Sequence, residues 1–125
     1  MIYEKKYSLF SFIVLLALPV HSQTSWVNVD RAAFSSGSAT YTFIALDNSG
    51  TPYLAYSDGA NNNKATVKKY IDTGWTTVGN EGFSAGGVSY VSLAIDKYGT
   101  PYAAFAAMQP GQEHKTCLIY LLILP

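Results

Sequence analysis

The sequence contains an internal repeat with a period of 49 residues. When the chain is shifted by this period, residues 26–56 align with residues 75–105 without a gap, and 13 of the 31 aligned pairs are identical. The longest identical run, residues 50–53, recurs at residues 99–102. Repetition at a fixed period indicates a supersecondary unit whose apolar surface is covered by neighbouring units. We therefore expect one small architecture that is built about twice.

Each unit has the pattern of short strands separated by turns. Residues 41–46 are β-branched and aromatic, and they are followed by a turn in which Asp47 can hydrogen-bond the backbone and Gly50 can adopt a positive φ. The equivalent turn of the second unit contains Asp96. Three more strands are expected at residues 53–56, 64–71 and 75–78. The sequence thus predicts an all-β fold of antiparallel four-stranded units.

Residues 44–56 and 93–102 resemble the tandem β-propeller repeats of secreted bacterial proteins, with an NHL-like or Kelch-like blade pattern. An apolar strand ends in Asp, the chain turns at Gly, and the next strand resumes with an aromatic residue. The resemblance implies antiparallel four-stranded propeller-type blades. It also implies that the repeated alanines, Ala45, Ala55, Ala94 and Ala104, are small because blades approach closely near the axis of a ring.

The number of blades is too small for a closed ring. The repeat region, residues 23–107, divides into units 26–74 and 75–107, or about one and a half to two blades. It comprises an N-terminal strand with its loop (26–40), a full blade (41–78) and the first strands of another (90–107). Propellers close with about four to eight blades. Three explanations remain open: a piece of a longer chain, a homo-oligomer such as a trimer that closes a ring, or a compact sheet.

The two ends of the chain differ from the repeat. Residues 1–22 have the layout of a secretory signal peptide: Lys5 and Lys6, an apolar run at 9–18, and a cleavage site after Ser22. The apolar run is too short for a membrane span, which needs about 20 residues. This segment predicts a secreted or cell-surface bacterial protein.

The C-terminal tail, residues 108–125, loses the repeat and becomes almost wholly apolar from residue 118. We expect it to reflect a frameshift or truncation near residue 108. The alternative is a genuine third strand in which residues 115–119 pair beside residues 102–106.

Composition excludes several classes of function. The chain carries eight basic and eight acidic residues, and this balance argues against a protein that binds nucleic-acid phosphates through a basic surface. The single cysteine, Cys117, cannot form an intrachain disulfide. Apart from His21 in the predicted signal peptide, His114 in the tail is the only histidine, and no catalytic constellation is recognised. We therefore expect no enzyme activity and no cofactor.

The candidate binding residues are repeated aromatic side chains, which could stack on sugar rings. Packing between blades is the competing interpretation, and both interpretations also apply to Tyr41 and Tyr90. The loop 58–63 offers oxygen ligands but lacks the spacing of a calcium loop, so no metal is expected. The candidates are Trp26, Tyr53, Trp75 and Tyr102.

These observations predict a secreted binding or surface-interaction module whose ligand is a carbohydrate or a protein. The alternative is a fragment of a secreted propeller enzyme, a hydrolase or lyase, whose catalytic residues lie on absent blades.

Overall fold

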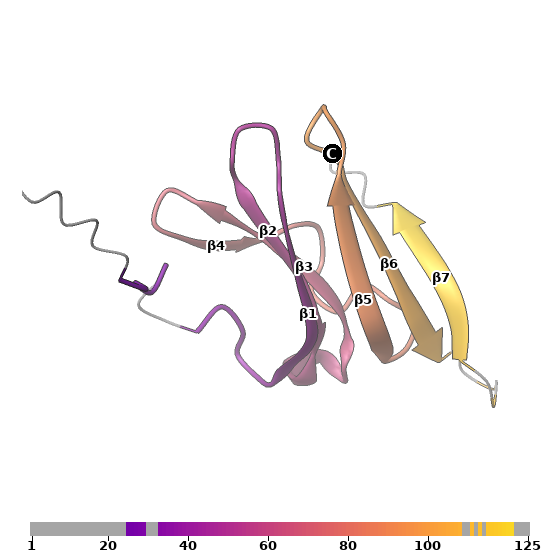
Figure 1. The fold of residues 1–125 in the computed structure, drawn as a ribbon. Coiled ribbons are helices and arrows are strands. Elements are labelled where there is room, and N and C mark those ends of the chain that lie inside the picture. Colours follow the sequence, from indigo (N-terminus) through magenta and orange to yellow (C-terminus); the bar gives the residue numbers. More distant parts are fainter. Residues whose placement is uncertain (1–24, 30–32, 109–110, 112, 114, 122–125) are drawn as a thin grey trace, which may run out of the picture.

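The computed structural model describes residues 25–29, 33–108, 111, 113 and 115–121. Within them the fold is all-β, and its only helical element is a single 3₁₀ turn. The strands form a four-stranded antiparallel sheet of order β1-β2-β3-β4 and a second antiparallel sheet of order β5-β6-β7 (Figure 1). The elements are β1 (Ala39–Leu46), β2 (Pro52–Asp58), η1 (Gly59–Asn61), β3 (Lys64–Ile71), β4 (Gly74–Thr77), β5 (Val88–Ile95), β6 (Pro101–Met108) and β7 (Lys115–Leu121).

The four-stranded sheet confirms the strands that the sequence predicts for one unit. Strand β3 has the predicted bounds, and β4 begins and ends one residue before residues 75–78. The N-terminal strand expected within residues 26–40 is wrong for the part described, because residues 25–29 and 33–38 contain no strand. A strand at this position would need the edge of a preceding sheet as its partner.

Strand β7 pairs antiparallel with β6, from Tyr102 opposite Leu121 to Met108 opposite Lys115. The structure therefore forms a third strand in the part of the tail where the alternative interpretation predicts one.

The two β-hairpin turns that follow β1 and β5 are built identically. In the first turn, Asp47 Oδ1 accepts hydrogen bonds from the backbone N–H groups of Ser49 and Thr51 at 2.8 and 2.9 Å. Asp96 Oδ1 accepts from the residues two and four further on, also at 2.8 and 2.9 Å. The bond from Thr51 is the largest cause of the lowered pKa of Asp47. Both aspartates are thus turn-forming residues, as the repeat predicts.

The core lies between the two sheets. Tyr53, Ala55 and Val67 on one face of the first sheet join Leu93 and Phe105 of the second sheet in a single buried cluster. Strand β1 lies beside β5 in this arrangement (Figure 1). The turns of the two sheets also touch, because the Asn48 side-chain amide donates to the carbonyl of residue 97 at 3.2 Å. The units therefore stack face to face, and each helps to bury the other.

A phenylalanine ahead of each sheet covers an aromatic side chain on that sheet. Phe34 packs edge-on against Tyr56 of β2, with ring centroids 5.2 Å apart. Forty-nine residues on, Phe83 packs against Phe105 of β6 at 5.8 Å. We call Phe34 and Phe83 the covering phenylalanines. They show that the repeat extends from the strands into the connecting segments.

Candidate functional site

Two tyrosines at equivalent positions of the repeat have an unusual backbone conformation. Tyr41 in β1 has φ 50° and Tyr90 in β5 has φ 54°. Each lies at an irregularity of its strand pairing, between Thr40 and Phe43 or between Ser89 and Ser92. A left-handed conformation is rare and strained for a bulky residue, and β-bulges redirect side chains. The same strain at the same place in both units points to a role for these side chains.

The bulges bring the two tyrosine rings together at the junction of the sheets. Their centroids are 5.5 Å apart with an interplanar angle of 50°. Both side chains remain accessible, since Tyr41 is 48% and Tyr90 is 74% exposed. We call them the tyrosine pair. An exposed aromatic pair held by strained backbone can present ring faces and phenolic hydroxyl groups to a ligand.

An open cleft of about 510 Å³ lies beside the tyrosine pair, between the first and second sheets. One wall is held by a hydrogen bond from the hydroxyl of Ser57 to the carbonyl of Asn63 at 2.9 Å. The same carbonyl accepts from the backbone N–H of Val88 at 2.8 Å and joins the two walls. The lining residues are Thr40, Tyr41, Ser57, Asn63, Gly87, Val88, Ser89 and Met108.

The lining combines hydroxyl groups, an amide and backbone polar groups with apolar side chains. These groups can orient a polar, uncharged ligand by hydrogen bonds while apolar surface contacts its carbon atoms. Such a lining is suited to contact with a polar, uncharged ligand.

The aromatic residues selected from the sequence do not form one site. Tyr53 is only 5% exposed and belongs to the core. Trp75 packs against Phe34 and Tyr70, with ring centroids at 6.2 and 5.5 Å. The structure thus gives Tyr53 and Trp75 a packing role, which the sequence offered as the competing interpretation.

The other two selected residues are accessible. The indole of Trp26 is fully exposed. Tyr102 is exposed on the outer face of β6, where its hydroxyl donates to Asp96 Oδ2 at 3.2 Å. Neither of them lines the cleft. The tyrosine pair was not among the selected candidates. In the sequence, Tyr41 and Tyr90 are two repeated tyrosines to which the packing interpretation also applies.

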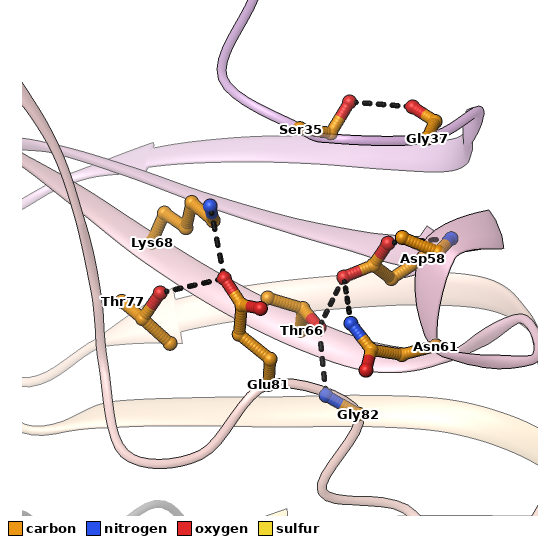
Figure 2. Close-up of polar contacts among 10 residues, drawn as sticks. Ser35, Gly37, Asp58, Asn61, Thr66, Lys68, Thr77, Glu81 and Gly82 are labelled. Carbon is orange, nitrogen blue, oxygen red and sulfur yellow. Dashed lines mark hydrogen bonds and ion pairs between the residues drawn. The ribbon is translucent and has the colours of Figure 1, made fainter.

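The loop that could have held calcium has a different organisation. Asp58, at the end of β2, is buried, and its two carboxylate oxygens accept hydrogen bonds from the N–H of Ala60 (3.1 Å), the amide of Asn61 (2.9 Å) and the hydroxyl of Thr66 (2.9 Å) (Figure 2). Burial raises the pKa of Asp58, but the hydrogen bonds from Asn61, Thr66 and Ala60, together with the charge of Lys68, outweigh it, so the net pKa is lowered. The carboxylate is thus used to fix the loop.

The Asp58 network continues to the segment that leads into the second unit. Thr66 Oγ1 also accepts a hydrogen bond from the N–H of Gly82 at 2.8 Å. Beside it, Glu81 forms an ion pair with Lys68 at 3.1 Å and accepts a hydrogen bond from Thr77, as Figure 2 shows. These contacts hold the connecting segment on the outer part of the first sheet. We assign them a structural role.

In the part of the chain that the structure describes, no group of three or more His, Cys, Asp and Glu side chains could hold a metal ion. None of the described segments is a helix of the length and apolarity that crossing a membrane requires.

Comparison with known proteins finds no matching family model, no matching curated protein and no matching solved structure.

Proposed function

We propose that this protein is a secreted, non-enzymatic binding module built of propeller-type blades, and that it binds a carbohydrate at the tyrosine pair. Secretion rests on the predicted signal peptide at residues 1–22, which lie outside the described residues. Propeller-type blades are supported by two antiparallel sheets that repeat every 49 residues and stack through their faces. Faces stacked in this way are what neighbouring blades of a ring require.

The observation that carries the binding function is the geometry of Tyr41 and Tyr90. Two accessible rings are held 5.5 Å apart on strained backbone, and one of them, Tyr41, lines a cleft that has both polar and apolar walls. Packing alone does not require this strain, because an ordinary extended residue would continue the strand at lower conformational energy. A sugar ring presents C–H groups to an aromatic face and hydroxyl groups to nearby hydrogen-bond partners, and the cleft beside Tyr41 supplies such partners.

The test is binding of the purified protein to an array of defined glycans, followed by titration of the best glycan. The informative variants are Tyr41→Asn and Tyr90→Asn, because Asn tolerates the left-handed conformation while it lacks the ring. Tyr98→Asn is the matched control, since Tyr98 is 81% exposed and does not line the cleft.

We expect the wild type to bind one class of sugar and each variant of the pair to bind it at least about tenfold more weakly, which corresponds to about 1.4 kcal/mol. The Tyr98→Asn control should bind as the wild type does. Sugar binding that survives loss of both rings would contradict the proposed site. A protein that binds no glycan but captures a defined protein through the tyrosine pair would show the protein-ligand alternative instead.

A further inference from the structure

The outer face of the second sheet repeats a face that is buried in the first sheet. Tyr53 and Ala55 of β2 lie in the core between the sheets, and Tyr53 is 5% exposed. Their equivalents, Tyr102 and Ala104 of β6, lie on the face that points away from the first sheet, and Tyr102 is 39% exposed. The trailing face is defined by Ala94, Tyr102 and Ala104.

The opposite asymmetry exists on the first sheet. Leu93 of β5 is 4% exposed because the first sheet covers it, whereas its equivalent in β1, Ile44, is 60% exposed. Leu46 is similarly exposed, while its equivalent Ile95 packs against the core. The leading face is defined by Ile44 and Leu46. In the second sheet, the first sheet covers the equivalent apolar surface. The leading face of the first sheet has no such cover and is exposed.

The two open faces are therefore the two halves of an interface that the chain already contains. Between its own sheets, the Tyr53–Ala55 surface packs on the Leu93 surface. The trailing face repeats the Tyr53–Ala55 surface with identical residues, Ala94, Tyr102 and Ala104. The leading face repeats the Leu93 surface with conservative replacements, Ile44 for Leu93 and Leu46 for Ile95. We propose that a second copy of this protein occupies these faces, so that the trailing face of one copy packs on the leading face of the next.

A contact of this kind is head to tail, because each copy contributes a different surface. It repeats the arrangement in which β1 lies beside β5, so it places Tyr90 of one copy next to Tyr41 of the following copy. Burial of the exposed Ile44 and Leu46 side chains supplies its apolar driving force. Repeated head-to-tail contacts form a closed ring when the rotation between copies closes.

The test uses the mass of the purified protein in sedimentation equilibrium and two variants that each block one face. Ile44→Asp places a charge on the leading face, and Ala104→Arg places a bulky charge on the trailing face. Ile71→Asp is the matched control, because Ile71 is exposed at the end of β3 and belongs to neither face. Circular dichroism checks that each variant is folded. Leu46→Asp and Ala94→Arg replace any variant that is not.

We expect the wild type and the Ile71→Asp control to form a discrete oligomer and each blocked variant to be monomeric. An equimolar mixture of Ile44→Asp and Ala104→Arg should form a dimer, because one intact face of each kind remains. A monomeric wild type, a blocked variant that keeps the wild-type mass, or a mixture that stays monomeric would overturn the proposal. The mixture distinguishes this contact from a symmetric dimer, in which both partners would use the same blocked face.

Discussion

Tyr41 and Tyr90 are 49 residues apart in the sequence, and their rings are in contact across the junction of two sheets, at 5.5 Å between centroids. Both have positive φ angles, so the contact is maintained against a conformational preference of the backbone. The ring contact and the backbone preference therefore make opposite contributions to stability at these two positions.

The first prediction concerns this opposition. Tyr41→Asn or Tyr90→Asn alone removes a ring contact worth about 0.5–1.5 kcal/mol and relieves backbone strain of about 1–2 kcal/mol. The free energy of unfolding of each single variant, measured in urea, should therefore lie within about 1 kcal/mol of the wild-type value. The double variant should be more stable than either single variant, because the second substitution relieves strain without losing a further contact. Strictly additive losses would contradict this account.

The second prediction concerns the glycines of the hairpin turns. Gly50 and Gly99 have φ angles of 82° and 85°, and an added Cβ at either would meet no atom within 4 Å. Gly50→Ala and Gly99→Ala should each lower the free energy of unfolding by about 1–2 kcal/mol for conformational reasons alone. Gly74→Ala is the control, because its Cβ also has free space and its φ is not positive. It should be neutral or stabilising by up to about 1 kcal/mol, and equal effects at all three positions would refute the explanation.

The third prediction concerns a buried hydroxyl group. Among the described residues, the hydroxyl of Tyr56 is buried and makes no hydrogen bond of good geometry, and burial together with the nearby Asp58 carboxylate raises the pKa of this side chain. The equivalent residue of the second unit is Phe105. Tyr56→Phe should therefore raise the free energy of unfolding by about 1 kcal/mol, since an unsatisfied polar group is removed.

The reciprocal variant, Phe105→Tyr, is the control for Tyr56→Phe. It adds a hydroxyl group to a side chain that is 1% exposed, so it should destabilise by about 1–3 kcal/mol. Thermal unfolding of both variants measures the two effects. Destabilisation by Tyr56→Phe would show that the hydroxyl makes a favourable interaction in solution.

The fourth prediction concerns acid. The pKa of Asp58 is lowered in the folded state, so the stability that its carboxylate contributes is present above its unfolded pKa, about 3.9, and is lost as the pH falls through the folded pKa. Asp58→Asn should reduce the free energy of unfolding at pH 7 by about 1–3 kcal/mol. The difference from the wild type should shrink as the pH falls below about 4. A difference that is constant from pH 7 to pH 2 would show that the charge of Asp58 is unimportant.

Local structure could be predicted where the sequence contains its physical cause. Alternation and β-branching define β3, and an aspartate followed by a glycine three residues later defines the two hairpin turns. The bulges at Tyr41 and Tyr90 could not be predicted in this way. No glycine or asparagine marks them, and a tyrosine at positive φ contradicts its local preference.

The candidate site was harder to predict because burial depends on the neighbouring sheet. Tyr53 and Tyr102 occur in the same four-residue sequence, yet one is in the core and the other is exposed. The difference arises from the position of each unit in the stack, which a local pattern does not encode. The repeat did identify Tyr41 and Tyr90 as equivalent residues, but only the geometry separated them from the packing tyrosines.

The covering phenylalanines have a consequence for how such a chain can grow. Because each one lies just ahead of the sheet that it covers, a segment cut immediately after β4 begins with its own cover and continues into its own strands. Duplication of such a segment inserts a whole unit together with its covering phenylalanine and leaves the aromatic contacts of the preceding unit intact. Evolution could thus lengthen or shorten the array by whole units without redesigning the junctions.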